Sequence, residues 1–477
     1  MCGIAGFLNP RNNDKKTEKE IYQILRKMNE VQRHRGPDDE GIFLENGCAL
    51  GHVRLSILDL YRGHQPMCKK KEGNTYAIIL NGEIYNMKTL KEQLIKEGEM
   101  FSTTSDTEVV LTGYIRYGIS YIEELNGIFS IALWDGKRKK LYLIRDRVGV
   151  KPLFYTKRGD TLIFASEIKG LFAYPGVKPV INREGLCEIF GLGPAKSYGK
   201  GVFKDIYEVL PGHFLEYDRE GLKDRAYWEL KAKEHTDSEK DTIEHTRWLV
   251  KDAVEMQMLS DIPISTFLSG GVDSSLVTAI CAKKLQKEGK NLNTFSFDFV
   301  NNHKYFKSNA FQPSEDRPWV DKMVDHAKTD HRYLECDNEN MIENLYKAVD
   351  ARDLPCMADV ESSMLYFCSK VVKYNKVTLT GECADEIFGG YPWFHKEECF
   401  KAEIFPWSMD MQPRKMLLND DILQKVDLES YVRTAYQKTI NETPKLYGED
   451  QIEARRRQIS YLNLRWFMVT LMDRMDR

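Results

Sequence analysis

A short glycine-rich segment, Ser269 to Ser275 (SGGVDSS), constrains the fold of this chain more than any other feature. It follows an apolar, β-prone run over 262–268 and precedes a helical run over 276–285, which predicts a strand, a tight turn and a helix start. Such a turn gathers backbone N–H groups at a helix N-terminus, where the helix dipole favours an anion such as phosphate. The Lys-Ser/Thr ending of a Walker A loop is missing. A serine N-cap on a core helix is the alternative.

Length and charge narrow the possible classes of protein. A chain of 477 residues is too long for one ordinary core, so two or three domains are expected. The net charge of −3 and the absence of a basic stripe argue against a nucleic-acid partner. The longest apolar stretches, such as 128–134, are far shorter than the ~20 residues of a membrane span, and no signal-peptide pattern opens the chain. The ten cysteines are dispersed without a C-x-x-C pair, so neither a zinc site nor a disulfide framework is expected. These features predict a cytoplasmic protein.

Cys2 becomes the first residue once Met1 is trimmed. Its α-amine, with a reference pKa of about 7.7–8, could then act as the base for its own thiol, and the thiolate could attack a carboxamide carbonyl. A buried structural cysteine is the alternative. Small and apolar residues alternate over 2–7, which predicts a buried strand that holds this terminus, and helical spacing over 18–31 predicts a helix.

Polar residues lie within or next to three apolar runs of the N-terminal half. Arg54 lies in a strand candidate over 48–60, so it either pairs with an anion such as a ligand carboxylate or lies at a strand edge. Asn81 and Gly82 follow a strand candidate over 76–80; they form a hairpin turn or supply the two donors of an oxyanion hole. Asp106 either caps a helix or binds a substrate ammonium.

Strand and helix patterns alternate in the C-terminal half. Buried strand candidates over 294–299 and 376–380, separated by helical stretches, predict a parallel sheet with ligands at the carboxyl ends of its strands. The second one runs into the segment 380–386 (TGECADE), whose three carboxylates suit magnesium-bound pyrophosphate; a solvated acidic turn is the alternative. The polar stretch 231–241 predicts a linker after a last strand over 212–218.

Four motifs of the N-terminal half, CGI at 2–4, RGPD at 35–38, NGEIYN at 81–86 and RDRVGVKPLFY at 145–155, resemble the class II N-terminal-nucleophile glutamine amidotransferases. Together with the SGGVDSS loop, the whole chain resembles the glutamine-hydrolysing asparagine synthetases. The resemblance implies an α+β N-terminal-nucleophile (Ntn) sandwich (αββα) over 2–218 and a linker over 219–241. An α/β ATP-pyrophosphatase domain (adenine nucleotide alpha hydrolase-like) with a parallel sheet is implied over 242–477.

The resemblance also implies roles for individual residues. Cys2 would be the nucleophile, Asn81 and Gly82 would form the oxyanion hole, and Arg54, Asn81, Glu83 and Asp106 would hold glutamine. The synthetase domain would bind ATP and Mg²⁺, with Asp273, Glu382 and Asp385 as metal and pyrophosphate ligands. The implied ATP-binding residues are Leu268, Ser269, Gly270, Gly271, Asp273, Ser274, Phe297, Thr380 and Gly381.

The implied reaction converts aspartate, glutamine, ATP and water into asparagine, glutamate, AMP and diphosphate, through a β-aspartyl-adenylate and ammonia passed between the domains. A related ligase that adenylates a different carboxylate is the alternative. The chain departs from the family pattern at Ala384, where the family usually has serine, and it stops at Arg477, where the family continues, so a C-terminal truncation is expected. The resemblance further implies a possible homodimer.

Overall fold

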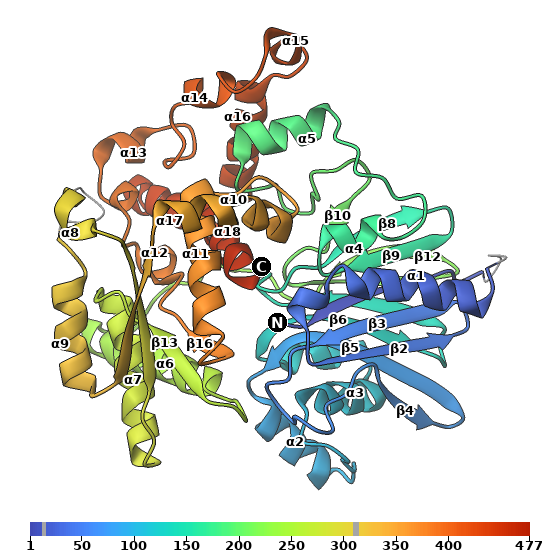
Figure 1. Cartoon of the computed structure of the whole chain (residues 1–477). Helices are drawn as coiled ribbons and strands as arrows, with labels where there is room; N and C mark the ends of the chain where they lie inside the picture. Colours follow the sequence, from blue (N-terminus) through green and yellow to red (C-terminus); the bar gives the residue numbers. More distant parts are fainter. Residues whose placement is uncertain (12–15, 309–313) are drawn as a thin grey trace. The chain divides into compact units, whose positions relative to one another are not determined.

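The structure is a computed structural model and describes residues 1–11, 16–308 and 314–477. The chain divides into two compact units (Figure 1). Unit 1 comprises Met1–Leu230, Asp421–Val426 and Met475–Arg477, and unit 2 comprises Lys231–Asp420 and Asp427–Arg474.

Two antiparallel sheets of six strands each form the centre of unit 1. The first has the strand order β10-β8-β9-β1-β3-β2, and the second has the order β12-β11-β7-β6-β5-β4. The strand expected over 2–7 is β1, which pairs with β3 on one side and β9 on the other. The strands are β1 (Gly3–Leu8), β2 (Asp39–Glu45), β3 (Cys48–Arg54), β4 (Met67–Lys71), β5 (Asn74–Ile84), β6 (Gly127–Asp135), β7 (Lys140–Arg145), β8 (Phe154–Arg158), β9 (Thr161–Ala165), β10 (Tyr207–Glu208), β11 (His213–Asp218) and β12 (Gly221–Ala226).

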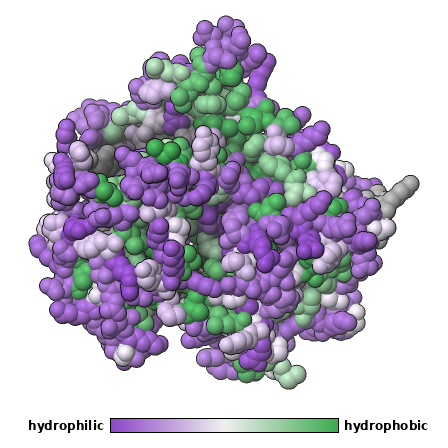
Figure 2. All heavy atoms as spheres, viewed as in Figure 1, coloured by the Kyte–Doolittle hydropathy of each residue, from purple (hydrophilic) through white to green (hydrophobic). Residues whose placement is uncertain are grey.

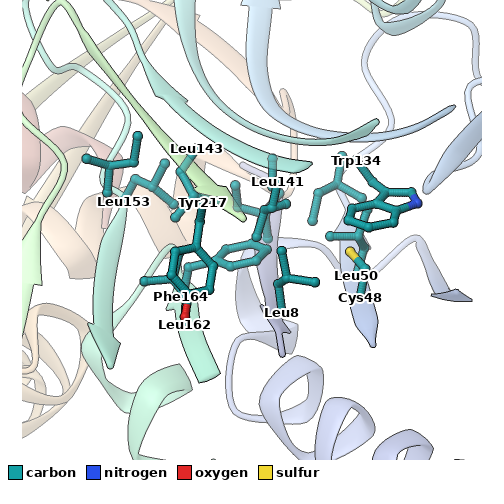
Figure 3. Close-up of a cluster of buried hydrophobic side chains, with 14 of the residues drawn as sticks. Leu8, Cys48, Leu50, Trp134, Leu141, Leu143, Leu153, Leu162, Phe164 and Tyr217 are labelled. Carbon is teal, nitrogen blue, oxygen red and sulfur yellow. The ribbon is translucent and has the colours of Figure 1, made fainter. Parts of the chain in front are cut away.

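One buried hydrophobic cluster joins side chains of the two sheets (Figure 3). Because side chains alternate along a strand, Ile4 and Leu8 of β1 share one face, and Ile79 of β5 and Trp134 of β6 meet them from the second sheet. Burial of each such side chain contributes about 1.5–3 kcal/mol. The core therefore fixes β1, and with β1 the position of Cys2 immediately before it.

Helices cover the outer faces of the two sheets in unit 1. Helix α1 begins with a capping box of Thr17 and Glu20 and packs on β1 and β3, while α3 packs on β5. This helix, sheet, sheet, helix order confirms the predicted αββα sandwich. The helices of unit 1 are α1 (Glu18–Glu30), η1 (Arg33–Arg35), α2 (Met87–Lys96), α3 (Asp106–Tyr117), η2 (Ile119–Glu124), α4 (Ile168–Phe172), α5 (Arg183–Cys187) and η3 (Glu188–Leu192).

Unit 2 contains a parallel sheet with the order β15-β14-β13-β16. Its strands are β13 (Ile264–Phe267), β14 (Asn293–Phe299), β15 (Asp330–Cys336) and β16 (Val377–Leu379), so the predicted parallel sheet is confirmed and β15 is added. The chain proceeds from β13 outward to β15 and then returns to β16 on the opposite side of β13. This reversal beside β13 is a topological switch point, where α/β sheets bind ligands.

Helices connect the strands of unit 2 and extend beyond its sheet. Helix α7 follows β13 directly, as the segment 269–285 predicts. The helices are α6 (Glu239–Gln257), α7 (Val272–Lys287), α8 (Asn302–Tyr305), α9 (Arg317–Ala327), α10 (Asn338–Arg352), α11 (Ala358–Val371), α12 (Ala384–Phe388), η4 (Pro392–Phe394), α13 (Glu397–Lys401), α14 (Gln412–Lys415), α16 (Leu428–Glu442), α17 (Gln451–Leu462) and η5 (Asn463–Phe467). Two further helices, α15 (Asp420–Leu423) and α18 (Met468–Asp476), each contain residues assigned to both units.

The structure corrects one prediction about unit 1. The strand over 212–218 is not the last one, because β12 follows it and pairs with β11 in a hairpin. The turn residues between the two strands, Arg219 and Glu220, are charged, and this polarity makes β12 resemble part of a linker.

Charged and polar side chains dominate the face of the molecule shown in Figure 2, with hydrophobic ones scattered among them. This matches a charged fraction of 30%. Among the helices of the described ranges, none combines the length and the apolar character that a membrane span requires.

Candidate functional site

Cys2 lies at the start of β1, where two groups hold it. Its Sγ donates to the carbonyl oxygen of Leu55 at 3.7 Å, and Arg35 Nε donates to the Cys2 carbonyl oxygen at 2.8 Å. Burial raises the pKa of the thiol, while the N-terminal amine, the Leu55 hydrogen bond, Arg54 and Arg35 act against that rise. A thiol in this environment needs a base to become a nucleophile.

The N-terminal amine, here that of Met1, can serve as such a base. Burial lowers the pKa of this amine to about 5, with smaller contributions from Arg35 and Lys151 in the same direction. An amine with that pKa is neutral near pH 7 and can accept a proton. Trimming of Met1 would place the corresponding amine on Cys2 itself.

Asn81 and Gly82 lie inside β5 and not in a hairpin turn. The Asn81 side chain is 1% exposed, and within the described residues neither its amide oxygen nor its amide nitrogen has a hydrogen-bond partner. A buried amide without a partner costs about 1–3 kcal/mol, so such a group calls for a ligand or another explanation. Gly82 has φ +143°, and a Cβ there would lie 1.9 Å from the carbonyl oxygen of Ile128, so only glycine fits.

Arg54 is buried at the end of β3 and is not exposed at a strand edge. Its Nη2 donates to the carbonyl oxygens of Leu58 and Asp59, both at 2.8 Å, and so holds the loop after β3. Arg54 also lies close enough to Cys2 to favour its thiolate. A guanidinium can bind a carboxylate as well as these carbonyl groups.

Glu83 and Asp106 form an acidic pair next to the end of β5. Burial, reinforced by the nearby Asp106 carboxylate, raises the pKa of Glu83 to about 7. Asp106 accepts a hydrogen bond from the backbone N–H of Ile84 at 3.0 Å, and Ser105, not Asp106, caps α3. Burial raises the pKa of Asp106 as well, so the two neighbouring carboxylates form a site that a cation such as a substrate ammonium would stabilise.

The glycine-rich loop between β13 and α7 is held by its own serines. Ser274 Oγ donates to the carbonyl oxygen of Gly271 at 3.2 Å and accepts from the backbone N–H of Ser269 at 3.2 Å. Gly270 has φ +79°, and a Cβ there would lie 2.7 Å from Trp319 Cβ at the start of α9. The loop leads into the N-terminus of α7, with Gly271 as its N-cap, and the backbone N–H groups at a helix N-terminus can bind phosphate.

The loop after β16 lies against this glycine-rich loop. A Cβ at Gly381 would lie 2.8 Å from the Asp273 carbonyl carbon and 2.8 Å from the Ser274 nitrogen, so the two loops are in direct backbone contact. Burial raises the pKa of Asp273 and of Asp385, and the Asp385 carboxylate adds to the rise at Asp273. The topology therefore brings these two acidic residues, distant in sequence, together beside the switch point.

Glu382 has a partner of its own. Arg474 Nη2 donates to Glu382 Oε1 at 2.6 Å. Among the described residues, no group of three or more histidine, cysteine, aspartate and glutamate side chains is arranged to hold a metal ion. Mg²⁺ needs only one or two protein carboxylates when substrate phosphates supply other ligands, so Asp273 and Asp385 fit that ion together with a nucleotide.

The remaining predicted nucleotide-site residues lie near the ends of the three strands. Leu268 is 1% exposed and its backbone N–H donates to the carbonyl oxygen of Phe295. The Phe297 ring stacks on Phe367 with ring centroids 4.2 Å apart, and Thr380 Oγ1 accepts from the backbone N–H of Glu382. These contacts fix the positions of three residues that are predicted to line the nucleotide site.

Sequence reasoning missed Arg474 and the partners of Arg35. Arg474 is separated from Glu382 by 92 positions, and Asp476 from Arg35 by 441, so no local pattern links them. The one feature of the sequence that could have indicated these ion pairs is the density of charged residues in the last turn of α18. That density is equally typical of an exposed helix end.

Comparisons with known proteins cover both units. Residues 1–228 match the family described as "Glutamine amidotransferase domain", and residues 245–477 match "Asparagine synthase". The chain is 46% identical over 478 residues to "Asparagine synthetase [glutamine-hydrolyzing] 3" of Bacillus subtilis, covering 100% of this chain and 77% of that protein. It is 34% identical to "Putative asparagine synthetase [glutamine-hydrolyzing] 2" of Methanocaldococcus jannaschii, covering 82% of this chain and 76% of that protein. The chain therefore belongs to the family of the glutamine-hydrolysing asparagine synthetases.

Proposed function

We propose that this chain makes asparagine from aspartate, with glutamine as the nitrogen donor and ATP as the source of energy. The observation that carries the proposal is its similarity, along its whole length, to the B. subtilis glutamine-hydrolysing asparagine synthetase. The arrangement of residues supports glutamine hydrolysis by residues 2–218 and adenylation by residues 242–477. A cytoplasmic location and a homodimer are also proposed, on the family resemblance.

In the proposed glutaminase reaction, the α-amine of trimmed Cys2 takes the thiol proton and the thiolate attacks the carboxamide carbon of glutamine. The carbonyl oxygen becomes an oxyanion, which the Asn81 amide and the Gly82 backbone N–H stabilise. The protonated amine then gives its proton to the leaving nitrogen, and ammonia departs from a glutamyl thioester. Water hydrolyses the thioester and releases glutamate.

Residues around the nucleophile would orient the glutamine. The Arg54 guanidinium suits the α-carboxylate, and the Glu83 and Asp106 carboxylates suit the α-ammonium. Binding of a cation would favour the ionised form of Glu83, whose pKa of about 7 allows a mixture of forms without ligand. These contacts place the carboxamide at the thiol.

In the proposed synthetase reaction, the loop over 269–274 binds the phosphates of ATP through backbone N–H groups at the N-terminus of α7. Asp273 and Asp385 would hold Mg²⁺, which neutralises phosphate charge when it is bound. A side-chain oxygen of aspartate attacks the α-phosphorus, and the bond to the β-phosphate oxygen breaks, releasing diphosphate. Ammonia then attacks the activated carbonyl carbon, AMP leaves with the aspartate oxygen, and asparagine forms.

An oxygen-isotope experiment tests this route. Aspartate labelled with ¹⁸O in its side-chain carboxylate is incubated with the protein, ATP, Mg²⁺ and ammonia, and the products are analysed by mass spectrometry. One ¹⁸O atom should appear in AMP and none in diphosphate, because the carboxylate oxygen stays on the α-phosphorus. Label in inorganic phosphate with formation of ADP would contradict adenylation. Label in AMP from another carboxylic acid, and none from aspartate, would favour the alternative acceptor.

A further inference from the structure

A buried charge cluster surrounds the first residues of unit 1. It contains the cations Arg35 and Lys151 and the anion Asp476, whose side chains are 1%, 3% and 0% exposed. Asp476 Oδ2 accepts from Arg35 Nη2 at 2.5 Å, and Asp476 Oδ1 accepts from Lys151 Nζ at 3.0 Å. One carboxylate therefore bridges two cations in a setting with little solvent screening.

Both cations also reach the N-terminal residues. Arg35 Nε donates to the Cys2 carbonyl oxygen at 2.8 Å, and Lys151 Nζ contacts Met1 Sδ. Glu167 accepts from Arg35 Nη1 at 3.0 Å and fixes the other end of the guanidinium. The Arg35 side chain is thus locked in place at three points, one of which is Cys2 itself.

The electrostatic balance at the N-terminal amine follows from these positions. Arg35 and Lys151 lower the pKa of this amine, and Cys2 and Asp476 raise it. The charged groups that face the amine and the thiol from the surrounding elements are Cys2, Arg35, Arg54, Glu83, Lys151 and Asp476. Of the acids in this set, Asp476 is the one that is bonded directly to both Arg35 and Lys151.

We infer that Asp476 is a positioning residue for the nucleophile: by bridging Arg35 and Lys151 it holds Arg35 on the Cys2 carbonyl and offsets the positive charge beside the α-amine. The inference rests on the proposed glutaminase function and adds a residue that does not touch glutamine. With Asp476 neutral, Lys151 would lose its carboxylate partner and Arg35 would keep only Glu167, so the positive charge beside the amine and the thiol would be offset less. Both groups would then deprotonate at lower pH.

The test is the pH dependence of Cys2 alkylation, which requires no catalysis. The protein is treated with iodoacetamide at a series of pH values, and the labelled N-terminal peptide is quantified by mass spectrometry, which also shows whether Met1 is present. Asp476→Asn should move the midpoint of the Cys2 curve to lower pH by roughly one unit, the effect of one nearby charge in a partly shielded site. Asp476→Glu, which keeps the charge, should restore the wild-type midpoint.

Asp473→Asn is the matched control. Asp473 lies on the same helix, α18, and pairs with another buried arginine, Arg352, at 3.1 Å in unit 2. Asp473→Asn makes the same change in charge at a largely buried ion pair, and should leave the Cys2 midpoint unchanged. Lys151→Met removes one cation and should move the midpoint to higher pH, so an Asp476 variant that fails to fold does not prevent the test.

An unchanged midpoint in Asp476→Asn, or an equal shift in Asp473→Asn, would overturn the inference. A midpoint that does not rise in Lys151→Met would do the same. Glutamate release by the unmodified protein is measured separately. Absence of that release would count against the proposed function, whereas the alkylation curves would still decide the position of Asp476.

Discussion

Arg474 Nη2 lies 2.6 Å from Glu382 Oε1, in an ion pair whose two side chains are 10% and 25% exposed. Glu382, Asp273 and Asp385 are the three predicted metal ligands. Among the described residues, Glu382 is the one of the three that forms an ion pair with an arginine or lysine side chain. Arg474 therefore fixes Glu382 and supplies positive charge where a nucleotide's phosphates are proposed to bind.

Arg474→Met should impair the synthetase reaction and leave glutamine hydrolysis intact. A hydrogen bond between charged groups contributes about 1.5–3 kcal/mol, so diphosphate release from ATP and aspartate should fall roughly tenfold or more. Arg465→Met is the control, since Arg465 pairs with Glu442 at 3.3 Å on the surface, where ion pairs contribute little. Equal diphosphate release by the two variants would show that the pair has no part in the reaction.

Asn81→Ala should lower kcat for glutamate release by about 10²–10³, because loss of one oxyanion donor typically has that effect. The KM for glutamine should change little, since the interaction forms in the transition state. Asn74→Ala on the same strand is the control; Asn74 Nδ2 donates to the carbonyl oxygen of Glu72, and its loss should not alter kcat. A rise in KM at constant kcat would instead assign Asn81 to glutamine binding.

Glu83 should make the protein less stable as pH rises. Its pKa is raised from 4.5 to about 7, so the native state binds more protons than the unfolded state between these values, and stability falls through that window. Glu83→Gln should remove this dependence and be more stable than the wild type at pH 8, by as much as about 3 kcal/mol. At pH 4 the two should be equal. Urea unfolding at both pH values checks this, and parallel stability curves would refute it.

Gly270→Ala should disrupt ATP use through the clash of its Cβ with the start of α9. Gly289→Ala is the matched control, because Gly289 has φ +72° against +79° for Gly270, while its Cβ would meet nothing within 4 Å. Both variants carry the cost of a left-handed alanine, about 1–2 kcal/mol. The KM for ATP should rise in Gly270→Ala alone, as diphosphate release at varied ATP would show. A similar rise in both would mean that backbone strain, and not the clash, is responsible.

Local patterns in the sequence predicted many of the helices and strands, because hydrophobic periodicity, capping residues and glycines lie within or next to each element. The helix over 18–31 and the strand before the SGGVDSS loop are close to α1 and β13, where periodicity, caps and glycines agree. β15 was not identified, because its sequence DHRYLEC is largely polar and its exposure is intermediate along most of its length. A strand of that kind is specified by its pairing with β14.

The candidate site was predictable where motifs are contiguous and not where the fold joins distant residues. Asn81 was identified as a candidate donor, yet only the structure shows that its amide is buried without a partner. The contact of Gly381 with Asp273 depends on the strand order of the parallel sheet. The bond between Arg35 and Asp476 depends on the packing of chain segments 441 positions apart, which no local pattern encodes.

The central claim is that one chain couples glutamine hydrolysis at Cys2 to asparagine synthesis, and a comparison of nitrogen donors tests it most directly. Asparagine, glutamate, AMP and diphosphate are measured for the wild type and Cys2→Ala, each with glutamine and with ammonia. We expect equal amounts of asparagine, AMP and diphosphate from the wild type with either donor, and from Cys2→Ala with ammonia only. Asparagine formed from glutamine by Cys2→Ala, or no asparagine from the wild type with either donor, would contradict the account.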